Sequence, residues 1–195
     1  MLRTDLQIST RDQLHLIINE MDYKVGVEVG VEVGEYTEYL LKETNAFIYG
    51  VDCWQYVDGY CDIANISNRK HNLNMMEAFE RLNPFIEQDR CALVRKFSAD
   101  FAKEFEDGSL DFAYIDANHS RPGASSDLMA WGPKIREGGM LAGHDFLDGM
   151  YLVADQLSEF GVISAVMDYL KDKHYRLYVT TDEIWPTWYI IKEMK

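Results

Sequence analysis

The feature that most constrains the fold is the stretch Val25–Thr37, which reads VGVEVGVEVGEYT. A short apolar run reaches Glu28, and Gly30 and Gly34 then open a turn into a segment with helical spacing, residues 35–43. A strand, a glycine turn and a helix in this order are typical of α/β proteins, in which bare backbone approaches a small cofactor. The first question is therefore which cofactor the turn accepts.

The rest of the chain continues the alternation of strand and helix. Apolar runs predict parallel strands over residues 25–30, 47–51, 91–97, 110–115 and 140–143, and a closing antiparallel pair over 175–179 and 188–191. Helical spacing covers residues 10–21, 35–43, 75–82, 99–105, 122–135 and 162–171. We expect an α/β fold: a doubly wound, mainly parallel seven-stranded sheet with a C-terminal antiparallel hairpin and helices on both faces.

Length and composition indicate one domain over residues 1–195, with an N-terminal helix within 1–22. The chain is 47% hydrophobic and 13% aromatic, and no run approaches the roughly 20 apolar residues of a membrane span. The N-terminal residues lack the apolar core of a secretion signal. The three cysteines, Cys53, Cys61 and Cys91, are scattered and odd in number, which argues against a disulfide framework and for a reducing compartment. We expect a cytoplasmic protein.

The formal net charge of −14 disfavours some partners. Nucleic acids and anionic membranes would be repelled at long range, and no basic patch offsets the repulsion. We expect a small-molecule partner and neither of these. Trp131, Trp188 and Tyr189 are expected in the core or in a subunit contact, which leaves a homodimer open.

Residues 55–90 form an unusually long connection. The segment is polar and Asn-rich over 65–74 before helical spacing resumes at 75–82, and Pro84 is expected to close the helix. Connections of this length are usually functional or mobile, so we expect this insertion to cover a substrate. The aromatic residues near the expected site segments could frame that substrate; they are Trp54, Tyr56, Tyr60 and Phe146.

Polar residues follow the predicted strands where each strand ends. They are Glu28, Asp52, Asp116 and the pair His144-Asp145. Ligands of open α/β sheets bind beyond the carboxyl ends of the strands, so these side chains should line one site.

The glycine turn does not suit a phosphate. A dinucleotide site uses G-x-G-x-x-G, whereas here Gly30 and Gly34 are four residues apart and flanked by Glu28, Glu32 and Glu35. Three carboxylates would repel a pyrophosphate but suit a ligand with an ammonium group.

The pattern Glu28-x-Gly30-x-x-x-Gly34 resembles the first motif of class I S-adenosylmethionine-dependent methyltransferases, which have a Rossmann-like fold. The resemblance implies that Glu28, Gly30 and Gly34 hold the methionine portion of the cofactor and that Asp52 binds the ribose hydroxyls. It also places Ser98 and Asp100, after the third strand, at the edge of the adenine.

The second half resembles the small-molecule O-methyltransferases of the macrocin and catechol type. The resemblance lies in the segments 107–120, 127–131 and 138–146, and in the terminal residues 184–192. It implies that Asp116, His144 and Asp145 bind Mg²⁺ or Mn²⁺, and that Asp116 borders the cofactor. His119, beside Asp116, is then the candidate general base. The imidazole of His144, where the metal-dependent enzymes more often have an acidic residue, favours softer first-row metals.

Two other functions use the same residues. His119 and His144 with Asp116 or Asp145 could form the two-histidine, one-carboxylate site of an iron oxygenase, although the glycine turn would then have no role. A protein that binds S-adenosylmethionine without turnover is the second alternative. The acceptor of a methyltransferase could be a hydroxyl of a sugar, a polyketide or a catechol-like compound.

Overall fold

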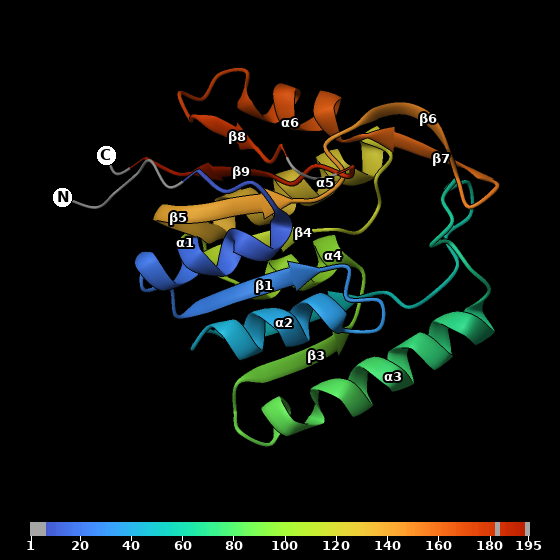
Figure 1. Ribbon diagram of the computed structural model, residues 1–195, viewed down its shortest axis with the longest axis horizontal. Helices are drawn as coiled ribbons and strands as arrows, with labels where there is room; N and C mark the ends of the chain where they lie inside the picture. The colour runs from blue at the N-terminus through green and yellow to red at the C-terminus, as the bar shows by residue number, and fades with distance from the viewer. Residues whose placement is uncertain (1–6, 182–183, 194–195) are drawn as a thin grey trace.

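The computed structural model describes residues 7–181 and 184–193, and its centre is a seven-stranded sheet. The strand order is β3-β2-β1-β4-β5-β9-β8, shown in Figure 1. The strands are β1 (Val25–Val29), β2 (Phe47–Asp52), β3 (Cys91–Arg95), β4 (Leu110–Ile115), β5 (Ile135–Gly143), β8 (Leu177–Val179) and β9 (Trp188–Ile191). The first five pair in parallel, and β9 runs antiparallel to both β5 and β8. The predicted Rossmann-like fold class is confirmed.

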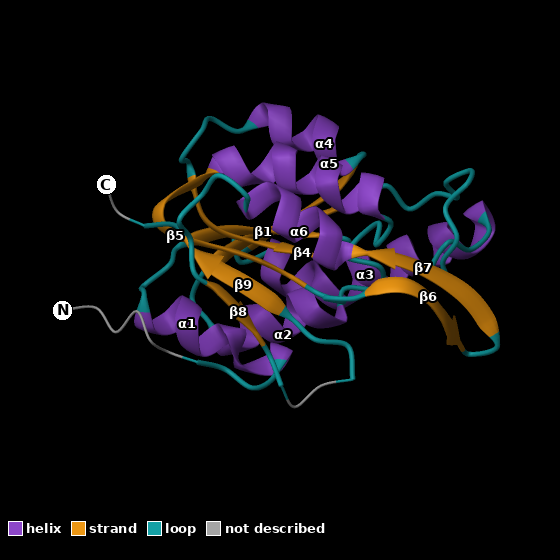
Figure 2. Ribbon diagram, turned by 90° about the horizontal axis from the view of Figure 1, so that it is seen from above, coloured by secondary structure: helices purple, strands orange, loops and turns teal. Residues whose placement is uncertain are grey.

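Helices cover both faces of the sheet, and each face has its own apolar core (Figure 2). The first face carries α1 (Leu14–Glu20), α2 (Glu35–Glu43) and α3 (Asn68–Ile86), and the second carries α4 (Ser98–Phe101), α5 (Arg121–Trp131) and α6 (Val162–Leu170). Strand β4 shows why two cores form: Phe112 and Tyr114 pack with the first set, whereas Ala113 and Ile115 pack with the second. Short 3₁₀ turns, η1 (Arg11–Gln13), η2 (Ala102–Glu104) and η3 (Gly132–Lys134), adjoin α1, α4 and α5. No helix within the described ranges is long and apolar enough to cross a membrane.

Backbone hydrogen bonds hold the end of β1 and the turn after it against the ends of β2 and β4. The amide of Gly30 donates to the carbonyl of Val51 at 2.9 Å, and the amide of Asp116 donates to the carbonyl of Val29 at 2.7 Å. Gly30 has φ +92°, and a Cβ at this position would lie 1.9 Å from the carbonyl oxygen of Asp116. Only glycine fits here, because both the conformation and the space exclude a side chain.

Helix α3 is longer than the sequence pattern predicted. It begins at Asn68 behind Ser67, whose hydroxyl caps the first turn, and it continues through Pro84 to Ile86. The prediction that Pro84 closes the helix was wrong. The last turn is kept because Leu82 is fully buried and Phe85 and Ile86 pack on the first core, which offsets the interrupted backbone bond.

Strand β5 begins earlier than the predicted 140–143, and the pair Gly138-Gly139 forms a bulge inside it. The register between β4 and β5 shifts here, with Leu110 opposite Ile135 and Phe112 opposite Met140. Gly138 has φ +75°, the left-handed conformation that such bulges use. Ile135, expected at the end of a helix, instead begins the strand.

A second, two-stranded sheet was not predicted. It is the hairpin of β6 (Asp148–Val153) and β7 (Gln156–Gly161), which projects from the body of the protein in Figure 2. Its two turn residues, Ala154 and Asp155, both have positive φ. Two-residue hairpin turns are usually recognised in a sequence by Asn-Gly or Asp-Gly. The Ala-Asp turn of this hairpin lacks that pattern.

The close contact at Gly30 leads to a stability prediction. We expect Gly30→Ala to lower the free energy of unfolding by about 3 kcal/mol or more, because it adds a backbone clash to the left-handed strain of about 1–2 kcal/mol. Gly59→Ala is the matched control: Gly59 has φ +75° but nothing within 4 Å of an added Cβ, so only the strain applies. Urea unfolding of both variants measures the difference, and equal losses would contradict the packing argument.

Candidate active site

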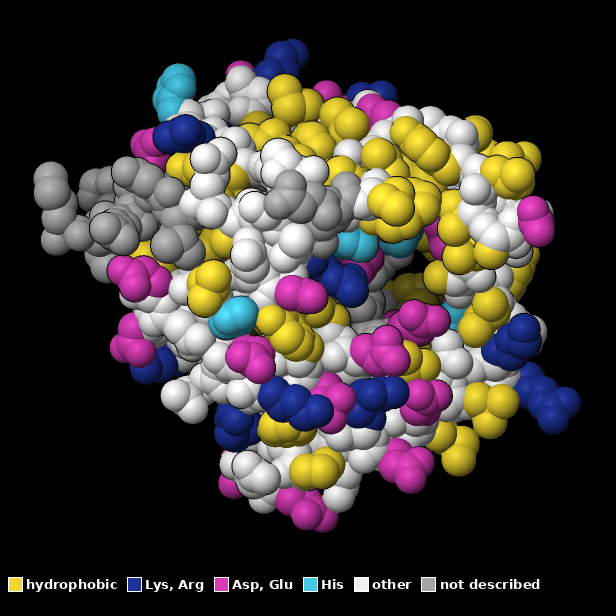
Figure 3. All heavy atoms as spheres, in the orientation of Figure 1, with side chains coloured by type: hydrophobic (Ala, Val, Ile, Leu, Met, Phe, Trp, Pro, Cys, Tyr) yellow, Lys and Arg dark blue, Asp and Glu magenta, His cyan; other side chains and the backbone are white. Residues whose placement is uncertain are grey.

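A cavity of about 450 Å³ opens at the carboxyl ends of the parallel strands. Figure 3 shows the molecule hollowed beside histidine and acidic side chains, with hydrophobic side chains gathered over α6 and the β6–β7 hairpin. The strand order places four polar residues along the rim: Asp116 after β4, Glu28 in β1, Asp52 ending β2 and Ser98 after β3. All four line the cavity. Glu28, Asp52 and Asp116 belong to the set predicted from the strand ends, whereas His144 and Asp145 of that set are not among the residues that line it.

Asp52 organises the glycine turn. Its Oδ2 accepts hydrogen bonds from the amides of Val31 at 3.0 Å and Glu32 at 2.9 Å, and its Oδ1 accepts from the amide of Trp54 at 2.7 Å. The carboxylate therefore fixes the backbone on two sides of the cavity. Oδ1 keeps a lone pair for a further donor, such as a hydroxyl.

Glu28 is a buried acid at the floor of the cavity. Burial raises the pKa of its carboxyl to about 8, although the hydroxyl of Thr37 donates a hydrogen bond to it. A cationic ligand group would stabilise the ionised form. The site thus suits an ammonium group, as the predicted methionine-binding role requires.

The residues after β3 separate into two groups. Ser98 lines the cavity, and its Oγ accepts a hydrogen bond from Nε1 of Trp131 at 2.8 Å. Asp100, predicted at the adenine edge, is not among the cavity residues; it is exposed and pairs with Lys103 at 2.7 Å. One residue separates them on a short helix, so their side chains point in different directions.

His119 lies among three carboxylates. Nδ1 is 3.4 Å from Asp62, and Nε2 is 3.2 Å from both Asp116 and Asp145. Burial alone would lower the pKa of this imidazole, but the hydrogen bonds to Asp116 and Asp62 outweigh burial and raise it to about 10. Both ring nitrogens therefore donate in this arrangement, which differs from the free lone pair that the predicted general base needs.

Asp116, His144 and Asp145 meet at the ends of β4 and β5. Nδ1 of His144 is 3.1 Å from Asp145 and 3.7 Å from Asp116, and one ligand atom from each residue lies within 4.8 Å of the others. Two carboxylates and one imidazole are a donor set that fits a divalent first-row metal or Mg²⁺. His119 does not belong to this group, although its Nε2 faces the same two carboxylates, and the proposed ligand set therefore has one imidazole and not two.

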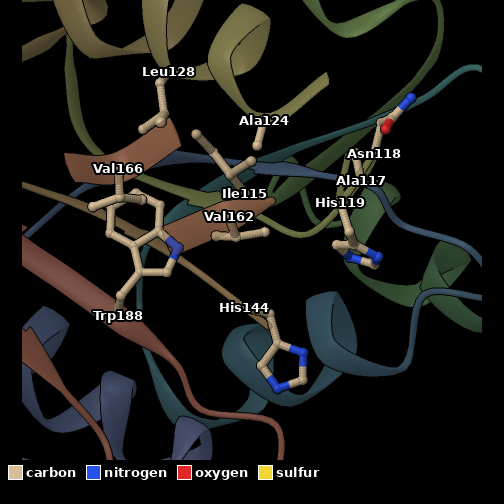
Figure 4. A pocket seen from close by; sticks show the side chains of 10 residues that line it. All are labelled: Ile115, Ala117, Asn118, His119, Ala124, Leu128, His144, Val162, Val166 and Trp188. Carbon is tan, nitrogen blue, oxygen red and sulfur yellow. The ribbon is translucent and has the colours of Figure 1, made fainter. Parts of the chain in front are cut away.

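A second, much smaller pocket lies behind these histidines (Figure 4). Aliphatic side chains of α5 and α6 and the indole of Trp188 form its other walls. Its volume of about 10 Å³ is too small for a cofactor, and the larger cavity is therefore the better candidate of the two for a ligand site.

Sequence reasoning missed three residues of the site: Arg11, Asp62 and Asp127. Nη1 of Arg11 is 3.5 Å from Asp116, and its guanidinium lies 4.7 Å from the ring centre of Tyr36. No local pattern marks Arg11 or Asp62, because the fold brings them to the site from the N-terminal 3₁₀ turn and from the β2–α3 loop. Asp127 alone carried a signal, as an acidic residue on an otherwise apolar helix face.

The sheet order and the cofactor-sized cavity at the strand ends define a class I methyltransferase fold. The family model for a methyltransferase domain matches residues 27–146, more than half of the chain, and the chain belongs to this family. A search of curated proteins gave no significant match.

Solved structures give the same fold at low sequence identity. An O-methyltransferase from Bacillus cereus in complex with SAH has a TM-score of 0.64 and 12% identity, covering 97% of this chain and 84% of that chain. A methyltransferase from Geobacter sulfurreducens has a TM-score of 0.62 and 11% identity, covering 96% of this chain and 81% of that chain. A third structure is the Burkholderia thailandensis 1,6-didemethyltoxoflavin-N1-methyltransferase with bound 1,6-didemethyltoxoflavin and S-adenosylhomocysteine. It has a TM-score of 0.59 and 15% identity, covering 97% of this chain and 80% of that chain.

The raised pKa of Glu28 predicts a pH-dependent stability. The folded chain holds this proton up to about pH 8 and the unfolded chain only to about pH 4.5, so the contribution is full below 4.5 and is lost as pH rises to 8. We expect Glu28→Gln to match the wild type near pH 4.5 and to exceed its free energy of unfolding increasingly up to pH 8, by at most about 1.4 kcal/mol per pH unit. The exposed Glu20→Gln is the control. A difference that stays constant between pH 4.5 and 8 in urea titrations would refute the assignment.

Proposed function

We propose that this protein transfers the methyl group of S-adenosylmethionine to a hydroxyl oxygen of a small molecule, with help from a divalent cation. The observation that supports this best is the convergence of Asp116, His144 and Asp145 at the same strand ends that carry the glycine turn. Cofactor site and candidate metal site thereby share Asp116. The transferred carbon and the acceptor oxygen would meet there.

The cavity offers complementary groups for each part of the cofactor. At the methionine end, Arg11 can bind the α-carboxylate while Glu28 binds the α-ammonium group, and both residues line the cavity. Asp52 can accept from a ribose hydroxyl. This distribution of one cation and two acids matches a zwitterion joined to a nucleoside better than it matches a phosphate ester.

At the acceptor end, Asp116, His144 and Asp145 would hold Mg²⁺, Mn²⁺ or a softer first-row metal. A bound cation there would lower the pKa of the acceptor hydroxyl. When bound, S-adenosylmethionine supplies an electrophilic methyl group on a sulfonium. The chain's own residues would align the acceptor oxygen with that carbon. The carboxylate of Asp116 would accept the proton that the hydroxyl loses, and His119 would hold Asp116 in place through its hydrogen bond.

The loop between β2 and α3 would close over the acceptor. Tyr60 donates to the carbonyl of Ala117 at 3.2 Å and accepts from the amide of His119 at 3.1 Å, so the loop is fastened to the site. Behind His119, the ring of Phe160 stacks on the imidazole and on Trp185. These aromatic faces favour an acceptor with a flat or apolar side, which fits a catechol or polyketide hydroxyl better than a sugar.

Cofactor binding can be tested through Arg11. We expect Arg11→Ala to weaken binding of S-adenosylhomocysteine about tenfold or more in isothermal titration calorimetry, because a charge-assisted hydrogen bond to the carboxylate is lost. Arg11→Lys keeps the positive charge, so its affinity for S-adenosylhomocysteine should fall less than that of Arg11→Ala. Absence of binding by the wild-type protein would overturn the proposed function, and equal affinities for all three would overturn only the role of Arg11.

The cation has a separate test. We expect methyl transfer from labelled S-adenosylmethionine to a panel of catechols and polyhydroxylated aromatics to stop in chelator and to return with Mg²⁺ or Mn²⁺. Asp145→Asn should raise the metal concentration needed for half-maximal activity while leaving binding of S-adenosylhomocysteine unchanged.

Two results of that test would decide against parts of the proposal. Full activity in chelator would remove the metal role from Asp116, His144 and Asp145. Tight cofactor binding with no transfer to any hydroxyl would favour a nitrogen acceptor or a protein that binds the cofactor without turnover.

A further inference from the structure

Asp127 is a buried acid in the cavity wall with no assigned role. Gly123, Ser126 and Asp127 lie at positions i, i+3 and i+4 of α5, so one face of this helix borders the cavity. The side chain of Asp127 belongs to that face, and the residue is only 5% exposed. A carboxyl group in such a position is costly unless a hydrogen-bond partner satisfies it.

The partner supplied by the protein is the hydroxyl of Ser98. That oxygen accepts a hydrogen bond from Nε1 of Trp131 at 2.8 Å, and the serine is hydrogen-bonded to Asp127. A serine hydroxyl has one proton. Because Trp131 can only donate and Asp127 takes the serine proton, Ser98 has no donor left for a ligand, and the polar group available to a ligand is Asp127.

No direct ion pair with a Lys or Arg of the described residues neutralises Asp127. Burial outweighs the Ser98 hydrogen bond and the charge of His119 and raises the pKa of the Asp127 carboxyl to about 6. Its capacity for further hydrogen bonds is therefore available to whatever fills this end of the cavity.

The position of Asp127 indicates which part of the cofactor it meets. Along the rim, Asp116 and Glu28 mark the methionine end, Asp52 follows with the ribose, and the residues after β3 come last. Ser98 belongs to that last group, and Phe97 beside it offers an apolar surface. A flat base with a polar edge is the chemical group that this end of the cavity accepts.

We propose that Asp127 recognises the 6-amino group of the adenine and makes the site selective for adenosine over its 6-oxo counterpart, an inference that rests on the proposed function. The carboxylate accepts a hydrogen bond from the amino group. A 6-oxo base presents an oxygen at the same place, and two acceptors facing each other repel. Asp127 thus takes the role that the sequence had suggested for Asp100.

The experiment compares two ligands by calorimetry: S-adenosylhomocysteine and S-inosylhomocysteine, its 6-oxo analogue. The wild-type protein should bind the adenine compound at least about tenfold more tightly. In Asp127→Asn the amide can donate to a 6-oxygen, so the preference should fall by about tenfold or more. Asp127→Leu should weaken binding of S-adenosylhomocysteine about tenfold to a hundredfold. Asp100→Leu changes an exposed acidic residue two positions after Ser98, and it should leave the affinities for both compounds unchanged.

Each outcome decides the inference. A preference that falls in Asp127→Asn supports it even where Asp127→Leu is too unstable to measure, because a merely structural role would not change the choice of base. If the wild type binds S-adenosylhomocysteine and Asp127→Asn keeps the full preference, Asp127 serves only to anchor Ser98 and Trp131. If the wild type binds neither compound, the proposed function fails and the inference with it.

Discussion

The rest of the site depends on the close approach of two backbones, at Gly30 and at Asp116. The amide of Asp116 bonds to β1, and the space where a side chain on Gly30 would lie is filled by the carbonyl of Asp116. The cofactor turn and the acidic end of β4 are thereby fixed to each other without any side chain between them. This is why Asp116 can face the cofactor cavity and the proposed metal site at once.

Charge balance is the second constraint. Asp62, Asp116 and Asp145 converge in a partly buried space, and their mutual repulsion is opposed by His119 and His144. Buried carboxylates require such partners. Asp116 and Asp145, two residues of the proposed metal site, thus also raise the pKa of both imidazoles, and ion pairs within the cluster hold its side chains together.

Sequence reasoning predicted what local patterns and strand ends determine. The parallel sheet, the glycine turn and the meeting of Asp116, His144 and Asp145 follow from periodicity and from the rule that ligands bind beyond strand ends. It could not predict Arg11 or Asp62, because tertiary packing alone brings them to the cavity. The predicted end of the helix at Pro84 was wrong, because burial of the last turn outweighs the effect of proline. The bulge at Gly138 and the hairpin that begins at Asp148 were not predicted, and the turn of that hairpin lacks the usual glycine.

The β6–β7 hairpin lies outside the seven-stranded sheet and is joined to the loop that borders the cavity. The amide of Glu159 donates to the carbonyl of Cys61 at 2.8 Å, and the amide of Ile63 donates to Oγ of Ser158 at 3.2 Å. Strand β6 is exposed over most of its length, and neither apolar core includes a residue of the hairpin. Substitutions on the exposed face of β6 can therefore change the surface beside the cavity at little cost to folding, while the glycine turn on the far side of the sheet end keeps its conformation.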